Sequence, residues 1–228
     1  MRRISVAIFL AGLLAAVPAR AQIPPSLDEI ARYGGLHAAA ANGDLAAIDR
    51  LVAGGADLNA RDGHGRTPLH VAAYAKQYAA ARALLQRGAD ANTLERQRYD
   101  IVTIAAVAND VEMLRIALAG GGSAKNVTSP YDGTALIAAA HLGHAAVVRT
   151  LIDAGAPLDH VNNLGWTALI EAVILGDGGK NHQDCVRALV EAHANLELAD
   201  RQGTTPIAHA RRRRYGEIVA ILERAGAK

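Results

Sequence analysis

Cysteine and aromatic residues are scarce in this sequence of 228 residues. Cys185 is the only cysteine, so the chain can form neither an internal disulfide framework nor a zinc site built from cysteine pairs. Aromatic side chains make up 4% of the residues, with a single tryptophan. Proteins that bind single-stranded nucleic acid stack the bases on aromatic rings. This composition therefore argues against a nucleic-acid partner.

The sequence also lacks the motifs of catalysis and metal binding. It contains no Gly-x-Ser-x-Gly nucleophile motif and no His-Glu-x-x-His metal motif. Its nine histidines do not include two clusters at a spacing typical of zinc ligands. We therefore predict a protein that is not an enzyme and that holds no cofactor and no metal ion.

Residues 1–21 have the composition of a cleavable secretory signal peptide. Arg2 and Arg3 form a positively charged start, residues 4–17 are a predominantly apolar run, and Ala19-Arg20-Ala21 supplies small residues at a cleavage site. The apolar run is shorter than the roughly 20 residues that cross a bilayer. We expect an exported protein, located in the periplasm if the source is Gram-negative.

Cleavage after Ala21 would change the charge of the protein. The full chain carries a formal charge of +2, and removal of three arginines leaves 21 basic residues against 22 acidic ones, a net charge of about −1. Such a chain has no global positive field to gather nucleic acid or anionic lipid. We predict no nucleic-acid partner, no membrane contact after cleavage, and a monomer.

The stretch of residues 65–92 carries the pattern from which most of the chain is built. Thr67 is a good N-cap residue, Pro68 suits the first helical position, and His70 can bond back to Thr67 as the partner in a capping box would. A second apolar stretch ends at Gly88, where a left-handed C-cap is expected. The pattern predicts two short helices joined by a turn.

The two landmarks of this stretch recur along the chain. The N-cap position is occupied, at intervals of 33, 33, 34, 33 and 38 residues, by Gly34, Thr67, Asp100, Thr134, Thr167 and Thr205. The C-cap position is occupied by Gly55, Gly88, Gly121, Gly155, His193 and Gly226. Two independent landmarks thus give one period of about 33 residues, which is typical of a repeat protein.

A unit of 33 residues that opens with Gly65-Arg-Thr-Pro-Leu-His70 and closes with Gly88-Ala-Asp-Ala-Asn92 resembles the ankyrin repeat. The resemblance covers residues 34–228 and implies an all-α solenoid of helix-turn-helix units with hairpin-like finger loops. The chain departs from the pattern in its third repeat, where Asp100 replaces the threonine, and in its fifth repeat, which is about five residues longer. The expected repeats are 34–65, 66–98, 99–132, 133–165, 166–203 and 204–228.

Residues 22–33 form a separate segment before the first repeat. Ser26-Leu-Asp-Glu29 has the spacing of a capping box, so we expect a short helix that covers the first repeat, as the terminal unit of a solenoid requires. Between repeats, Asp62-Gly63 and Asn162-Asn163 supply turn residues for the finger tips, whereas Ser129-Pro130 indicates an irregular tip.

The ankyrin resemblance implies a concave face, built from finger tips and first helices, that binds partner proteins. Trp166 is the sharpest candidate on it, because a rigid exposed tryptophan near Tyr99 and Tyr131 is a typical carrier of binding energy. The alternative for Trp166 is packing against the neighbouring finger. We predict a non-enzymatic protein-binding scaffold whose candidate contact residues are Trp166, Tyr99, Tyr74, His64, Arg96, Tyr131, His141 and Arg212.

Two other sites stay open at the level of the sequence. The insertion Gly176–Gln183 in the fifth repeat is rich in glycine and lacks the spacing of a phosphate-binding loop, so we expect a flexible surface loop. The alternative is that the insertion, with His182 and Cys185, forms a small-molecule or catalytic site. Burial of Cys185 in the core is the alternative, because it aligns with apolar positions of other repeats. The second site is Arg211–Arg214, a run of four cations that could bind an anionic surface.

Overall fold

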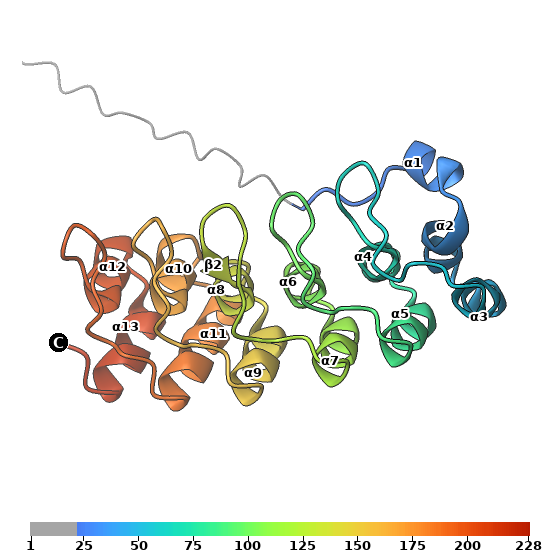
Figure 1. Cartoon of the computed structure of the whole chain (residues 1–228). Coiled ribbons are helices and arrows are strands. Elements are labelled where there is room, and N and C mark those ends of the chain that lie inside the picture. The colour runs from blue at the N-terminus through green and yellow to red at the C-terminus, as the bar shows by residue number, and fades with distance from the viewer. Residues whose placement is uncertain (1–21) are drawn as a thin grey trace, which may run out of the picture.

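The computed structural model describes residues 22–228, so the predicted signal peptide lies outside the described residues. Within them, the chain forms thirteen helices and one two-stranded sheet. Twelve of the helices form six pairs that are stacked side by side, and a loop rises beside the first helix of every pair after the first to form a row of fingers (Figure 1). The predicted all-α solenoid is confirmed.

The helix pairs follow the order of the repeats, and one additional helix, α1 Leu27–Arg32, precedes them. The first helices are α2 Gly35–Asn42, α4 Pro68–Tyr74, α6 Ile101–Val107, α8 Ala135–His141, α10 Ala168–Ile174 and α12 Pro206–Arg213. The second helices are α3 Leu45–Ala53, α5 Tyr78–Gln86, α7 Val111–Ala119, α9 Ala145–Asp153, α11 Lys180–Glu191 and α13 Gly216–Arg224. The first helices lie beside the fingers and the second helices lie on the opposite side (Figure 1).

Local side-chain chemistry sets where the first helices begin. The six residues at the predicted N-cap position all cap a helix, and in five of them the side chain accepts a hydrogen bond from the helix backbone. Thr67 and His70 form the predicted capping box, in which the Thr67 amide donates to His70 Nδ1 at 3.1 Å. Such caps satisfy amide groups that have no partner inside the helix.

The second helices end as the sequence predicts. The five glycines at the C-cap landmark have positive φ angles, and His193 adopts the same left-handed conformation at φ 64°. Each of these residues closes the helix with a backbone bond to a carbonyl in its last turn, as Gly88 does to Leu85. Glycine is favoured there because it has no Cβ to clash with the backbone.

Buried alanines let neighbouring first helices approach closely. Ala72, Ala105, Ala139 and Ala172 occupy one position in four successive repeats, and all are buried. Adjacent first helices pack directly on one another, α8 against α10 and α2 against α4. Larger side chains of both helices fill the remaining space, such as Leu136 of a first helix and Leu151 of a second helix, which are both fully buried.

One side chain closes each finger. Asp62 Oδ1 accepts hydrogen bonds from the amides of His64 and Arg66, at 2.8 and 2.9 Å. The same pair of bonds recurs in the other fingers at Glu95, Ser129, Asn162 and Asp200. The expected hairpins are therefore mostly turns. Among the described residues, a strand pair forms only between β1 Val127–Thr128 and β2 Gly133–Thr134, around the tip expected to be irregular.

The insertion of the fifth repeat is part loop and part helix, which corrects the expectation of a flexible loop. Helix α11 has twelve residues, whereas α9 in the preceding repeat has nine, so Lys180 begins an additional turn. The remaining loop is tightly packed. A Cβ on Gly176 would lie 2.7 Å from the His182 ring, and one on Gly178 would lie 2.5 Å from the Tyr215 ring. These glycines allow close packing.

Candidate protein-binding surface

We define the inner surface as the side of the stack formed by the fingers and the first helices (Figure 1). Seven of the eight predicted contact residues are at least partly exposed. His64, Arg96 and Arg212 are exposed. Tyr74, Tyr131, His141 and Trp166 are half-buried. The eighth, Tyr99, is not available at this surface.

The prediction that Tyr99 is an exposed anchor is wrong. Tyr99 is only 7% exposed and belongs to the hydrophobic core, and this burial raises the pKa of its hydroxyl. Its backbone is fixed as well, because the amide donates to Glu95 Oε1 at 3.1 Å and the carbonyl lies 3.2 Å from His70 Nε2. Tyr99 therefore holds the finger that precedes α6 against α4 of the second repeat.

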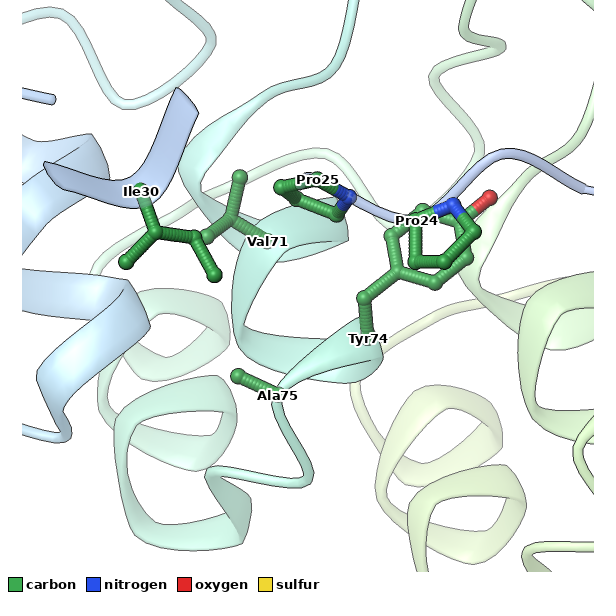
Figure 2. Close-up of a pocket in the computed structure, with 6 residues that line it drawn as sticks. All are labelled: Pro24, Pro25, Ile30, Val71, Tyr74 and Ala75. Atoms are coloured by element: carbon green, nitrogen blue, oxygen red, sulfur yellow. The ribbon is translucent and has the colours of Figure 1, made fainter. Parts of the chain in front are cut away.

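Tyr74 is partly covered by the chain's own N-terminal segment. Pro24, Pro25 and Ile30 line a small cavity together with three residues at α4, Val71, Tyr74 and Ala75 (Figure 2). The cavity measures about 50 Å³, which is room for little more than one water molecule. Burial raises the pKa of the Tyr74 hydroxyl. Tyr74 is thus a packing partner of the N-terminal segment.

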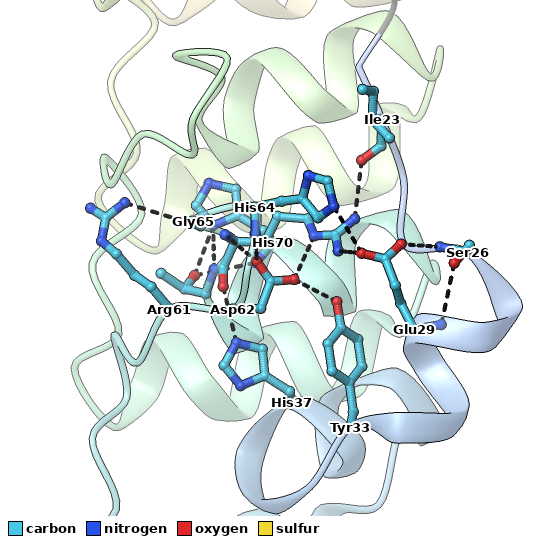
Figure 3. Close-up of polar contacts among 12 residues, drawn as sticks. Ile23, Ser26, Glu29, Tyr33, His37, Arg61, Asp62, His64, Gly65 and His70 are labelled. Carbon is cyan, nitrogen blue, oxygen red and sulfur yellow. Dashed lines mark hydrogen bonds and ion pairs between the residues drawn. The ribbon is translucent and has the colours of Figure 1, made fainter.

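Arg66 fastens this N-terminal segment to the stack. Its side chain is 1% exposed, and its guanidinium donates to Glu29 Oε1 at 2.5 Å and to Asp62 Oδ2 at 2.7 Å (Figure 3). A third bond reaches the carbonyl of Ile23 at 3.3 Å, and the Tyr33 hydroxyl donates to Asp62 Oδ2 at 2.6 Å. Arg66 therefore joins the N-terminal segment to the first finger.

The two carboxylates around Arg66 remain ionised over a wide pH range. A hydrogen bond from the Ser26 amide and the contacts of Arg66 lower the pKa of Glu29 to about 2. Burial alone would raise the pKa of Asp62, but hydrogen bonds from Tyr33 and Arg66 bring it down to about 2. The cluster is therefore a charged structural joint. Helix α1 has the predicted capping box, and it contacts both α2 of the first repeat and the first finger.

Finger tips are linked to one another by backbone bonds. The amide of Arg96 donates to the carbonyl of His64 at 3.1 Å, and the amide of Asn163 donates to the carbonyl of Tyr131 at 2.9 Å. The imidazole Nε2 of His64 also lies 3.1 Å from Glu29 Oε1. Such links hold the tips in a fixed row, so the exposed side chains of His64 and Arg96 and the half-buried side chain of Tyr131 are carried on a rigid frame.

The inner surface of repeats four to six has a different character. Within the described residues, the hydrogen bonds, ion pairs and cavity that hold the N-terminal segment all involve the first two repeats. Farther along the stack, Trp166 is half-buried beside the exposed Leu164, and His141 lies one repeat before it. Arg212 donates to Thr204 Oγ1 at 3.3 Å. This region offers large, partly or fully exposed side chains that lie outside the contacts of the N-terminal segment.

Sequence reasoning missed one residue in this region, Glu171 on α10. Its Oε1 accepts a hydrogen bond from Asn162 Nδ2 at 2.9 Å, while Oε2 lies 3.1 Å from His141 Nδ1. Alignment of the repeats could have found it, because the same position holds Val71 and Ile104 in other repeats. The first four repeats have apolar residues at this position, and only repeats five and six have titratable ones, Glu171 and His209.

The structure gives no support to a catalytic site at the insertion. Cys185 is fully buried in the core, and burial raises the pKa of its thiol to about 12. His182 Nε2 lies 3.0 Å from the carbonyl of His141, as His144 Nδ1 lies 3.0 Å from that of Ala106. Both histidines thus contact the end of the preceding first helix. Burial of the thiol and its raised pKa argue against a role of Cys185 as a nucleophile.

Metal and membrane sites can be assessed for residues 22–228. In that part of the chain, no three His, Cys, Asp or Glu side chains converge to hold a metal ion. None of the helices there is both long enough and apolar enough to cross a bilayer.

The sequence matches known ankyrin repeat proteins. Residues 24–95 and 102–179 match a family model described as ankyrin repeats in three copies, and residues 164–201 match the model of a single ankyrin repeat. The ankyrin repeat protein YahD of Escherichia coli (strain K12) is 37% identical over 103 residues, which are 45% of this chain and 51% of YahD. This match therefore spans about half the length of that relative.

Solved structures extend the comparison over most of the chain. An ankyrin repeat domain from Acinetobacter baumannii AYE is 46% identical, with a TM-score of 0.81 over 85% of this chain and 98% of that one. The ankyrin repeat protein EF0377 is 32% identical, with a TM-score of 0.78 over 86% of this chain and 98% of its own. The family models cover more than half of the sequence, and the chain belongs to the ankyrin repeat family.

Proposed function

We propose that this chain is a non-enzymatic scaffold that binds a partner protein on its inner surface, over repeats four to six. Ankyrin repeats generally mediate protein–protein interaction. A stack of repeats is a rigid frame, so a partner docks on a preformed surface and little conformational entropy is lost. The identity of the partner would be set by the side chains on that frame.

The choice of repeats four to six is supported by one observation. Trp166, the only tryptophan of the chain, is half-buried on a finger that lies outside the contacts of the N-terminal segment. Tryptophan is enriched among the residues that dominate binding energy in interfaces. By contrast, Tyr99 is buried, and Tyr74 packs against Pro24 and Pro25. The N-terminal half of the inner surface therefore has less to offer a partner.

Affinity capture tests this proposal. The full-length gene with a C-terminal tag is expressed in its own cells, and bound proteins are identified by mass spectrometry. We expect a protein captured in a fixed ratio, and we expect its loss in Trp166→Ala. Arg149→Ala is the matched control, because Arg149 is exposed on the second helix α9 and pairs with Glu191 at 2.9 Å, away from the fingers. Equal capture by wild type and Trp166→Ala would contradict the proposed surface.

We further propose that the chain is exported, is cleaved after Ala21 and acts as a monomer in the periplasm. Support comes from the charged, apolar and small-residue regions of residues 1–21 and from the charge of about −1 that cleavage would leave. Cell fractionation and intact mass measurement test it: the expected product begins at Gln22 and stays in the exported fraction. An unprocessed chain in the cytoplasmic fraction would refute export without bearing on partner binding.

A further inference from the structure

Glu171 is a buried carboxylate with an incomplete set of hydrogen bonds. Its side chain is 5% exposed. Oε1 accepts one bond from Asn162, whereas Oε2 has no hydrogen-bond partner among the described residues. The His141 imidazole is 3.1 Å from Oε2, but the contact lacks the alignment of a hydrogen bond. An ionised carboxylate offers about four acceptor positions, so most of the capacity of Glu171 is unused.

The fold does not require an acid at this position. Repeats two, three and four have Val71, Ile104 and Ala138 there, and these repeats form the same helix pair. Burial of a charge costs free energy unless the charge is paired and hydrogen-bonded. Asp100, another buried carboxylate, shows the contrast: it caps α6 and accepts bonds from Thr103 and from Asn126 Nδ2. Glu171 bonds to Asn162, which closes its finger, as His209 at this position of repeat six bonds to Asp200, but this link uses only Oε1.

Neighbouring charged groups are already engaged. On α12, the first helix of the next repeat, His209 Nε2 lies 2.7 Å from Asp200 Oδ2, and Arg212 donates to Thr204 Oγ1. On α8, the first helix of the preceding repeat, His141 is the group that lies against Glu171, and its side chain is 36% exposed. A movement of His141 toward solvent would open Oε2 to the inner surface. The site would then present a negative charge beside the finger that carries Trp166.

We propose that Glu171 receives a cationic side chain, lysine or arginine, of the partner protein. The ammonium or guanidinium group takes the place of His141 against Oε2 and donates the hydrogen bond that this oxygen lacks. A charge-assisted bond of this kind is stronger than a bond between neutral groups. The inference rests on the proposed function, because it names the chemistry by which the inner surface of repeats four to six recognises a protein.

Short peptides test the inference without the partner. The probes are acetyl-Ala-Arg-Ala-amide and acetyl-Ala-Lys-Ala-amide, with acetyl-Ala-Gln-Ala-amide as the neutral control. Two-dimensional NMR of the ¹⁵N-labelled protein follows the indole of Trp166 and the amides of α8 and α10. A cationic peptide should shift these signals with a dissociation constant in the millimolar range, and the effect should weaken as ionic strength rises.

Three variants make the test specific. Glu171→Gln keeps the acceptor for Asn162 but removes the charge, so it should weaken cation binding by at least about tenfold. His141→Ala uncovers Oε2 and should tighten binding. Glu191→Gln, at an exposed acid on the opposite side, should bind as the wild type does. Equal shifts with the neutral peptide, equal affinity in Glu171→Gln, or no shift with either cation would overturn the inference.

The two proposals can fail separately. If a partner is captured through Trp166 but neither cationic peptide binds, the protein-binding surface stands and the role of Glu171 is wrong. If the peptides bind through Glu171 but no partner depends on Trp166, the cation site stands and the scaffold surface is wrong.

Discussion

Arg66 and Glu29 form an ion pair of 2.5 Å that joins the second repeat to a helix 37 residues earlier in the chain. Asp62 completes the pair on the other side of the guanidinium at 2.7 Å. The side chains of Arg66 and Asp62 are only 1% and 8% exposed, so this part of the joint is shielded from water, whereas Glu29 is 22% exposed. The N-terminal segment is held to the inner surface largely by this joint.

Replacement of Arg66 by methionine should destabilise the protein markedly. The variant leaves Asp62 and Glu29 without their cation, and breaking a buried ion pair typically costs about 3 to 5 kcal/mol. We expect a lower midpoint of urea unfolding, followed by circular dichroism. We also expect faster hydrogen exchange of residues 23–33, because the segment loses its attachment.

Arg98→Met is the control for this experiment. Arg98 also pairs with an aspartate of another finger, Asp132 at 2.7 Å, but both side chains are about half exposed. Exposed ion pairs contribute at most about 1 kcal/mol, so the midpoint should change little. Similar losses in Arg66→Met and Arg98→Met would show that burial does not set the strength of the Arg66 joint.

His70 should make the stability of the protein depend on pH. Burial lowers the pKa of its imidazole from 6.5 to about 4. Between these values the unfolded chain binds a proton that the folded chain does not, so the free energy of unfolding falls as the pH falls from 6.5 to 4. The expected loss is roughly 3 kcal/mol. Urea unfolding measured at a series of pH values gives this slope.

His70→Gln separates titration from capping. Glutamine is a usual partner in a capping box, so the variant retains a side chain that can bond to the Thr67 amide but removes the proton-binding group. Its stability at pH 7 can differ from that of the wild type, but its slope between pH 6.5 and 4 should be smaller. An unchanged slope would mean that other groups carry the pH dependence.

The helix boundaries could be predicted because they depend on local chemistry. An N-cap such as Thr67 bonds to an amide three residues away, and a C-cap such as Gly88 needs only a permissive φ angle. Both requirements are visible within a few residues of sequence. Repetition made the helix boundaries easier to predict, because six copies of each landmark defined the period even where Asp100 or His193 replaced the common residue.

The candidate site could be predicted only in part because its contacts are long-range. The prediction for Tyr99 failed because the ring packs into the core between repeats. The position of one finger relative to the next cannot be read from the residue types at equivalent positions of the repeats. The cover over Tyr74 depends on Pro24, which lies 50 residues earlier. Glu171, in contrast, departs visibly from the apolar residues that the first four repeats have at its position, so a comparison of the repeats can find it.

Glu171 and Asp100 should respond differently to the same chemical change, acid to amide. Glu171 accepts one hydrogen bond, from Asn162, which a glutamine oxygen can still accept. Removal of a buried charge that accepts a single hydrogen bond is then neutral or stabilising, and we expect the free energy of unfolding of Glu171→Gln to stay the same or to rise by about 1 kcal/mol. Asp100 uses both oxygens as acceptors, so Asp100→Asn places two amide donors face to face at Asn126.

We expect Asp100→Asn to lower the free energy of unfolding by about 1 to 2 kcal/mol. The amide group introduced at position 100 and that of Asn126 are then both donors, so one of them is left without an acceptor. Urea unfolding of both variants under one set of conditions provides the comparison. A loss in Glu171→Gln as large as that in Asp100→Asn would assign Glu171 a structural role and would weaken the argument that it awaits a cation.

Cys185 should be inert in the folded protein. The thiolate is the reactive form of cysteine, and a pKa of about 12 leaves almost none of it near neutral pH, while burial blocks access to the sulfur. Alkylation by iodoacetamide, followed by mass spectrometry, should be at least about a hundredfold slower in the native state than in urea. Arg149→Cys in a Cys185→Val background is the positive control, since valine occupies the matching position 147 and residue 149 is exposed. If native Cys185 reacted as fast as this surface cysteine, the thiol would have to reach solvent, and a reactive site beside the insertion would again have to be considered.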